Sequence, residues 1–368
     1  MINNGHKVLV VIKSKDILET LLLNAGLPYV NINQHAHRSN KIGILWDMLV
    51  REWRIVRLCR KHKIDLLTGS TPDIAHAGWW LRKWRINTGE DDLNVVPAFV
   101  KIAGPFLQCF ISPYVCDSTP YENKSVHYPS YHELAYLHPN HFTPSEEKVK
   151  EYGIDVEKPY FILRFASLNA HHDSGIKGIN TEVAQRLIDI LSPQGKIYIT
   201  SERPLEPQFE QYRIHINPLD MHHVMAFASL YIGDSQTMAA EAGVLGVPFV
   251  RFNDFVGRIG YLRELEDVYQ LGYGVHATPL EADSPIKRAD GSEQPSGVEA
   301  LYERVEQLVS ISVENRKAAY QVRRDKMLSE KIDCAKFLTY FIEQYPASAE
   351  ETKKANEEQN QKFWEQFK

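Results

Sequence analysis

The fold is decided by residues 233–248, which read Gly233-Asp234-Ser235-Gln236-Thr237-Met238-Ala239-Ala240-Glu241-Ala242-Gly243-Val244-Leu245-Gly246-Val247-Pro248. A short apolar run, 230–232, precedes this stretch, and a second one, 249–252, follows it. The order predicts a strand, a tight turn, a helix and a second strand, which is the repeating unit of parallel α/β sheets. Gly233 permits the turn, and Ser235 or Asp234 is placed to cap the helix.

The same stretch is a candidate binding site. A helix N-terminus presents free N–H groups and favours negative charge, and the hydroxyls of Ser235 and Thr237 add donors there, so the turn suits a diphosphate. Glu241 follows about one and a half turns later, where its carboxylate can accept hydrogen bonds from ribose hydroxyls. The alternative interpretation is an ordinary capped helix of an α/β protein.

Residues 233–242 resemble the nucleotide-sugar donor site of GT-B glycosyltransferases and of the non-hydrolysing UDP-N-acetylglucosamine 2-epimerases. In those proteins a Ser/Gly-rich turn holds the diphosphate and a helix Glu holds the ribose. A wider pattern resembles the uncharacterised bacterial and archaeal domain-of-unknown-function family 354; its segments are 128–139, 163–165 with 170–173, 233–242, and 255–259 with 261–262. The resemblance implies two Rossmann-like α/β domains of GT-B type facing a cleft, a nucleotide-sugar donor with UDP as its nucleotide, and no cofactor.

Bulk properties exclude several classes of protein. The chain has 368 residues, of which 43% are apolar and 24% charged, and this composition is typical of a globular protein with two domains. Its net charge of −5 argues against general nucleic-acid binding, which needs a basic surface. No apolar run approaches the roughly 20 residues of a membrane span, and the first residues do not resemble a signal peptide. Four scattered cysteines indicate reduced thiols, so a cytoplasmic protein is predicted.

Strands and helices alternate through both halves of the chain. The predicted strands are 7–13, 29–32, 65–68, 108–114, 160–164, 196–200, 213–216, 230–233, 249–252 and 274–276. The predicted helices are 16–26, 41–63, 74–83, 181–191, 222–228, 237–245, 259–271, 297–310 and 313–344. This pattern divides the chain into an N-terminal domain (1–125), a Pro- and Tyr-rich linker (126–158), a C-terminal nucleotide-sugar domain (159–345) and a charged segment (346–368). The last segment is interpreted as a solvated helical tail, with a docking segment as the alternative.

The first residues resemble the end of the first helix and the second strand of the related folds. We therefore expect the N-terminal domain to lack its central first strand, unless about 25 residues precede Met1. The strands at 7–12 and 65–68 would flank the missing strand, and its absence would leave their edges unpaired. A rearranged sheet in which these two strands pair directly is the expected alternative.

Polar residues near the predicted strand ends extend the donor site. Arg164 and Lys177 are predicted to neutralise the donor diphosphate, although the loop between them can also be read as a polar surface loop. Glu202 is predicted to shape the base pocket, or to pair with Arg203. Three further candidates are His222 for the nucleotide, Arg258 for a phosphate and His172 for catalysis. The adjacent histidine pairs, 171–172 and 222–223, do not predict a metal site, because neighbouring side chains point apart.

The N-terminal domain carries candidates for the acceptor side. Glu90 and Asp91 lie at a probable strand end, where a carboxylate can act as general base towards an acceptor hydroxyl; a helix-capping acidic cluster is the alternative. Two stretches mix Trp with Arg and Lys, a combination that suits a membrane interface with anionic lipid. The residues concerned are Arg51, Arg54, Trp79, Trp80 and Trp84. An ordinary helix with a solvated basic face is the alternative.

Together these features predict a GT-B-like glycosyltransferase that transfers a UDP-linked sugar to a saccharide or lipid-linked acceptor in polysaccharide or glycolipid synthesis. It would act in the cytoplasm or at the inner face of the membrane. A UDP-sugar 2-epimerase and a non-catalytic sugar-nucleotide-binding protein are the two alternatives.

Overall fold

The computed structural model describes residues 1–13, 18–32, 41–166, 178–281, 283 and 285–368. The chain forms two compact units: unit 1 comprises Met1–Pro129 and Ala335–Lys368, and unit 2 comprises Ser130–Cys334. Unit 1 thus combines both ends of the chain, whereas the sequence pattern suggested a division into consecutive segments. Two predicted site residues, His172 and Lys177, lie outside the described residues.

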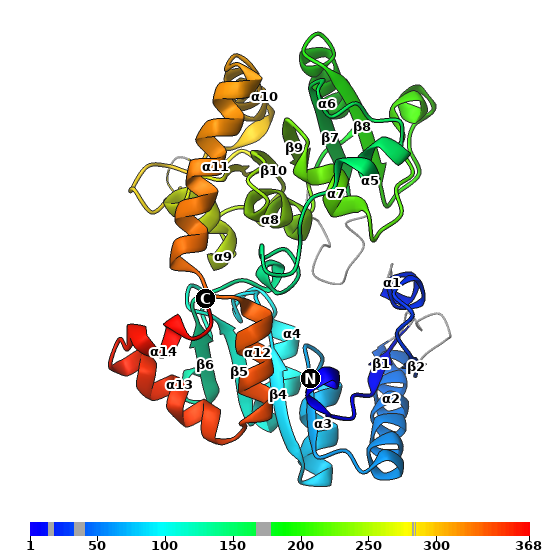
Figure 1. The fold of residues 1–368 in the computed structure, drawn as a ribbon, viewed down its shortest axis with the longest axis vertical. Coiled ribbons are helices and arrows are strands. Elements are labelled where there is room, and N and C mark those ends of the chain that lie inside the picture. The colour runs from blue at the N-terminus through cyan, green and yellow to red at the C-terminus, as the bar shows by residue number, and fades with distance from the viewer. Residues whose placement is uncertain (14–17, 33–40, 167–177, 282, 284) are drawn as a thin grey trace. The chain divides into compact units, whose positions relative to one another are not determined.

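The main sheet of unit 1 has four parallel strands in the order β3-β4-β5-β6 (Figure 1). Their bounds are Leu66–Gly69, Trp84–Thr88, Cys109–Pro113 and Ser125–Tyr128. Every residue of β5 is buried, as expected for an apolar central strand of a parallel sheet. β4 and β6 were not predicted: β4 lies in the Trp- and Arg-rich stretch, and β6 begins at the boundary of the predicted linker. The helices of this part of the chain are α1 (Leu18–Asn24), α2 (Lys41–His62), α3 (Pro72–Leu81) and α4 (Pro97–Ala103).

The first two strands form a sheet of their own. β1 (Val10–Ile12) pairs in parallel with β2 (Tyr29–Asn31), and Val10 lies opposite Tyr29. Among the described residues β3 pairs only with β4, so the expected direct pairing of 7–12 with 65–68 is wrong. Apolar packing holds the small sheet instead, because Val11 and Val30 pack against the cluster of α2 and β3 side chains that includes Ile55 and Leu67.

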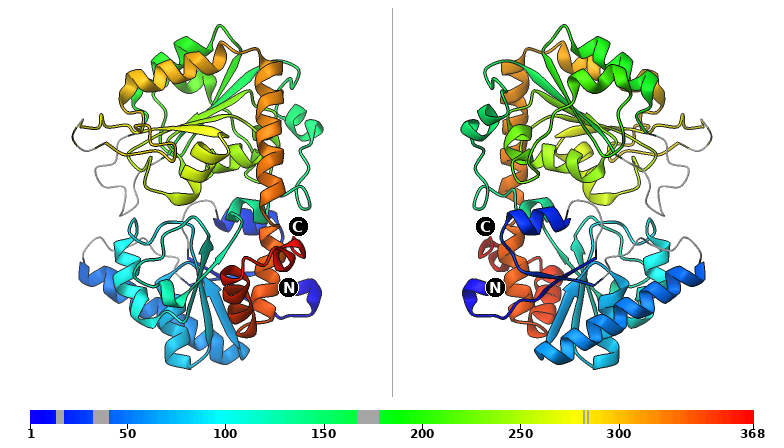
Figure 2. Two further views of the ribbon diagram at one scale, coloured as in Figure 1. Left: turned by 90° about the vertical axis from the view of Figure 1, so that its left-hand side faces the viewer. Right: turned by 90° about the vertical axis from the view of Figure 1, so that its right-hand side faces the viewer.

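The C-terminal helices belong to unit 1. They are α12 (Cys334–Glu343), α13 (Ala347–Glu357) and α14 (Gln361–Glu365), and they lie on the face of the four-stranded sheet opposite α2, α3 and α4 (Figure 2). Trp364 and Phe367 are buried against Phe337, and Asn356 Nδ2 donates to the His127 carbonyl oxygen of β6 at 2.9 Å. Residues 346–368 are therefore a docked helical segment and not a solvated tail.

Unit 2 is built on a five-stranded parallel sheet with the order β11-β10-β9-β7-β8. These strands are β7 (Tyr160–Phe165), β8 (Lys196–Ser201), β9 (Leu230–Gly233), β10 (Phe249–Phe252) and β11 (Gly272–Val275). The helices are α5 (Glu146–Glu151), α6 (Thr181–Leu191), α7 (Met221–Ala226), α8 (Gln236–Val244), α9 (Gly260–Arg263), α10 (Gly297–Val309) and α11 (Val313–Glu330). Short 3₁₀ helices occur in both units: η1 (Ile2–Asn4), η2 (Gly104–Phe106) and η3 (Glu122–Lys124) in unit 1, and η4 (His132–Ala135) and η5 (Pro207–Tyr212) in unit 2. In unit 2, η6 (Glu264–Val268) is a π-helix.

Two predicted elements of unit 2 differ from the structure. The strand expected at 213–216 is reduced to a single bridge between Ile199 and Arg213. The long helix expected at 313–344 is broken between Glu330 and Cys334, where Lys331 takes an extended conformation. A hydrogen bond from Ser130 Oγ to the Ile332 carbonyl oxygen, at 2.6 Å, holds this break beside the first residue of unit 2.

None of the described helices is both long enough and apolar enough to cross a membrane.

Candidate functional site

The strand order of unit 2 defines where a ligand binds in such a sheet. The chain runs from β7 outward to β8 and then returns to β9 on the other side of β7, so the order reverses between β7 and β9. In open α/β sheets ligands bind at the carboxyl ends of the strands, at such a switch point. Arg164, near the end of β7, lies in register opposite Gly233, the last residue of β9. The two segments singled out in the sequence therefore meet at this point.

The turn from β9 to α8 has the predicted geometry. Ser235 is the N-cap of α8, and its Oγ accepts from the Met238 backbone N–H at 3.4 Å. Gly233 is required by close packing, because a Cβ there would lie 2.5 Å from Tyr231 Oη and 3.0 Å from Arg164 Cβ. Ser235 and Gln236 are partly exposed, and Thr237 in the first turn is exposed. The helix N-terminus therefore presents its N–H groups and hydroxyls at the carboxyl edge of the sheet.

Asp234 does not cap the helix; it holds two backbone positions beside the turn. Its carboxylate accepts from Ala166 N at 2.6 Å and from Ile179 N at 3.3 Å, and the side chain is buried. Burial raises the pKa of Asp234 to about 6, and the two backbone N–H groups oppose this rise. Asn253 Nδ2 donates to the Asp234 carbonyl oxygen at 3.0 Å and fixes the turn from the side of β10.

Glu241 lies on α8 and forms a cluster with two aromatic side chains. Its Oε1 is 2.9 Å from His222 Nε2 on α7 and accepts a hydrogen bond of 2.9 Å from the Tyr136 hydroxyl. The centre of the His222 ring lies 5.5 Å from that of the Tyr136 ring, and Phe142 packs edge-on against the His222 ring. Glu241 and His222, both predicted site residues, are therefore brought together. Tyr136 was not among the predicted site residues, because nothing in its local sequence shows that η4 packs on α8.

Two side chains of the predicted donor site, Arg164 and Gln236, contact charged side chains. The Arg164 guanidinium contacts the Glu202 carboxylate, which directly follows the end of β8, so Glu202 pairs with Arg164. Gln236 contacts Arg251, a fully buried side chain of β10 whose Nε donates to Glu266 Oε1 at 2.9 Å. Arg251 and Glu266 were not predicted; a buried ion pair behind a helix N-terminus leaves no signal in the sequence. Arg258 is exposed in the loop after β10.

In unit 1 the acidic residues lie where the sequence placed them. Glu90 and Asp91 follow the carboxyl end of β4. The Glu90 carbonyl oxygen accepts from Cys116 Sγ at 2.9 Å, and the neighbouring Asp92 side chain accepts from Asp117 N at 2.9 Å. Asp92 is thus a structural residue of this edge, and Glu90 and Asp91 remain the predicted acids. The part of the chain that the structure describes contains no group of three or more His, Cys, Asp or Glu side chains placed to hold a metal ion.

Comparison with known proteins yields only structural likeness. No protein-family model matches the sequence, and a search of curated proteins finds no match. Spinosyn forosaminyltransferase SpnP aligns over 93% of this chain and 92% of its own, with 13% identity and a TM-score of 0.58. A UDP-N-acetylglucosamine 2-epimerase aligns over 88% of this chain and 86% of its own, with 15% identity and a TM-score of 0.54. A putative UDP-N-acetylglucosamine 2-epimerase from Listeria monocytogenes aligns over 88% and 83%, with 13% identity and a TM-score of 0.51.

These likenesses establish the fold. The chain is a mixed α/β protein with two parallel-sheet units of the GT-B glycosyltransferase and epimerase type, so the predicted fold class is confirmed. Membership of the domain-of-unknown-function family 354 stays a prediction.

Proposed function

We propose that this chain is a GT-B-type glycosyltransferase whose unit 2 binds a nucleotide-activated sugar. The observation that carries the proposal is that Arg164 and the Ser-capped N-terminus of α8 meet at the switch point of the unit 2 sheet, with Glu241 further along the same helix. Such a helix end favours an anion, a guanidinium binds phosphate oxygens, and a carboxylate on the same helix binds hydroxyls. A nucleoside diphosphate has both kinds of group: its phosphates suit the helix end and Arg164, and its ribose hydroxyls suit Glu241.

The chemistry follows from charge. When a sugar leaves its nucleotide, negative charge develops on the departing diphosphate. The N-terminus of α8 and Arg164, with Lys177 as a further predicted ligand, would stabilise that charge, and no metal ion is needed for this step. Glu90 or Asp91 would act as general base towards the acceptor hydroxyl, with His172 as a further predicted catalytic residue. The donor is proposed to be a UDP-sugar, and the acceptor a saccharide or a lipid-linked saccharide in polysaccharide or glycolipid synthesis.

A UDP-sugar 2-epimerase is the second candidate, because two of the structurally similar proteins bear that name. Incubating the full chain with UDP-sugars and an acceptor mixture separates the candidates. Free UDP with a glycosylated acceptor marks transfer, and a new sugar isomer marks epimerisation. Binding of UDP without turnover marks a non-catalytic sensor.

The donor site is tested by Glu241→Ala. We expect a loss of UDP affinity of roughly 1–3 kcal/mol, the usual result of removing a charged hydrogen-bond partner, measured by calorimetry on the folded variant. Glu306→Ala is the matched control, because Glu306 forms only an exposed ion pair with Arg186 on the surface of unit 2. Equal UDP affinities of the two variants would exclude Glu241 from the site.

A further inference from the structure

Unit 1 exposes an unusual amount of tryptophan. The chain has six Trp residues, and five of them lie between residues 46 and 84. These five side chains are between 43% and 62% exposed, whereas Trp364 is buried. Trp is normally a buried residue whose exposure in a group marks an interaction site, and at membrane surfaces its amphipathic ring lies at the level of the lipid headgroups.

Part of this surface is one face of α2. The exposed residues Trp46, Leu49, Trp53, Arg57 and Arg60 follow one another at spacings of three and four, so they form a single stripe along the helix. The stripe is apolar in its first half and basic in its second, and the Arg57 guanidinium lies 5.6 Å from the centre of the Trp53 ring. The opposite face of α2 carries Ile55, Val56 and Cys59 into the core of unit 1. The outer face of α2 therefore has both an apolar part and a basic part, in addition to the apolar face that packs into the core.

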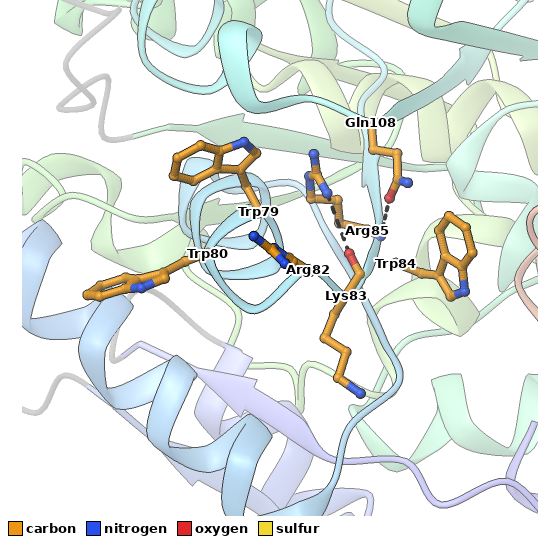
Figure 3. A pocket seen from close by; sticks show the side chains of 7 residues that line it. All are labelled: Trp79, Trp80, Arg82, Lys83, Trp84, Arg85 and Gln108. Atoms are coloured by element: carbon orange, nitrogen blue, oxygen red, sulfur yellow. Dashed lines mark hydrogen bonds between the residues drawn. The ribbon is translucent and has the colours of Figure 1, made fainter.

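The turn from α3 to β4 continues the surface. Trp79, Trp80 and Trp84 line a hollow of about 720 Å³ together with Arg82 and Lys83; the Arg82 side chain lies among the rings, and the Lys83 side chain extends away from them (Figure 3). Lys83 Nζ lies 3.5 Å from Asp65, three residues beyond the end of α2, so the turn adjoins the basic end of the helix. Trp79 and Trp84 each have one edge packed, on Phe106 and Tyr345 respectively. Trp80 is the most exposed of the five.

Charge selects the partner. Residues 41–85 contain ten Lys and Arg against four Asp and Glu, a net charge of +6 in a chain whose total is −5. Two of the predicted membrane residues do not contribute: Arg51 Nε lies 3.5 Å from the buried Asp73, and Arg54 contacts the Ile32 carbonyl oxygen. Exposed Trp rings interleaved with Arg57, Arg60, Arg82 and Lys83 complement an anionic lipid surface.

We propose that this Trp/basic surface docks unit 1 on an anionic lipid bilayer. It consists of Trp46, Leu49, Trp53, Arg57, Arg60, Trp79, Trp80, Arg82, Lys83 and Trp84. The rings enter the headgroup region, and the basic groups contact lipid phosphates. The docking surface lies in unit 1 and the proposed donor site in unit 2, so the two proposals stand or fall separately.

The test uses the full chain and vesicles of phosphatidylcholine, with or without phosphatidylglycerol. We expect sedimentation with the anionic vesicles only, binding that falls between about 0.05 and 0.5 M NaCl, and quenching of Trp fluorescence by brominated lipid. Arg82→Gln with Lys83→Gln should weaken binding at least tenfold, since each basic group near an anionic surface contributes about fivefold. Trp80→Ser should weaken binding and reduce the quenching.

Matched controls lie on unit 2. Lys148→Gln with Lys150→Gln removes two exposed charges of α5, and Val322→Ser changes a side chain of α11 that is 70% exposed; both should bind like the wild type. Circular dichroism establishes that each variant is folded. Three outcomes would each overturn the proposal. The protein could bind neutral and anionic vesicles equally, or the control variants could lose as much vesicle binding as the Trp/basic variants. It could also form a stable dimer whose contact buries these Trp rings in place of lipid.

Discussion

Replacing Asp234 by Asn should remove a defined part of the pH dependence of unit 2. The Asp234 carboxyl is buried to 2% exposure and accepts two backbone hydrogen bonds. Burial raises its pKa from 3.8 to about 6. A carboxyl with a raised pKa binds its proton more tightly in the folded protein than in the unfolded chain. Its contribution to stability is therefore fully present below pH 3.8 and is lost as the pH rises through about 6.

The magnitude follows from the two pKa values. A rise of about two units corresponds to about 3 kcal/mol over the full range, and to about 2 kcal/mol between pH 4.5 and pH 7.5. Asn cannot ionise in this range, so the variant lacks this pH-dependent contribution to the free energy of unfolding. Asn also has one acceptor oxygen where Asp has two, and the unpaired backbone N–H costs a further 1–3 kcal/mol, roughly, that does not depend on pH.

The assay is urea unfolding of wild type and Asp234→Asn at several pH values, followed by circular dichroism. The quantity of interest is the difference between the two proteins in their free energy of unfolding, which should shift by about 2 kcal/mol in favour of the variant from pH 4.5 to pH 7.5. All six Trp residues belong to unit 1, so Trp fluorescence reports separately on the unit that is not mutated. The reasoning is refuted if the free energies of unfolding of the wild type and of Asp234→Asn change equally with pH between pH 4.5 and pH 7.5.

Two further substitutions test the neighbouring contacts. Glu202→Gln removes the carboxylate that faces Arg164; we expect UDP and pyrophosphate to bind about fivefold more tightly by calorimetry, whereas Glu210→Gln, which removes the exposed partner of Arg213, should have no effect. A weaker affinity would show that Glu202 itself contacts the nucleotide. Arg251→Met leaves Glu266 buried without its partner and should cost about 3–5 kcal/mol in urea unfolding, while Arg251→Met with Glu266→Met should recover most of that loss. An unchanged stability of the single variant would show that the pair does not hold the helix end.

Local chemistry explains what the sequence could predict. The strand, turn and helix at 230–244 follow from a short apolar run, a glycine and a capping serine that lie next to one another in the chain. Arg164 and Glu202 were placed at strand ends because parallel strands deliver their carboxyl ends to one edge. The same rule placed Glu90 and Asp91 correctly at the end of β4, although β4 itself was not recognised.

The missed features depend on contacts between distant segments. Tyr136 reaches Glu241 only because η4 packs on α8, 105 residues further along the chain. The charged composition of 346–368 suggested a solvated tail, but three aromatic residues near its end, Phe363, Trp364 and Phe367, pack on α12 within unit 1. In α2 the Trp and Arg pattern was visible. The sequence could not show that Arg51 and Arg54 turn inward while Trp53 and Arg57 turn outward.

The turn between β9 and α8 is held by polar contacts that are expensive to bury, and the proposed donor site offers a reason for this cost. Asp234 keeps a carboxylate in a place that penalises its charge, and Arg251 and Glu266 place an ion pair in the core directly behind Gln236. Apolar side chains would fill these positions at a lower cost in stability. Polar groups, however, fix backbone N–H directions, and a site that stabilises developing charge needs its donors aligned before the substrate arrives. If the proposed donor site is correct, the buried polar framework around α8 preorganises it, and Asp234→Asn and Arg251→Met should each weaken UDP binding even under conditions in which both variants remain folded.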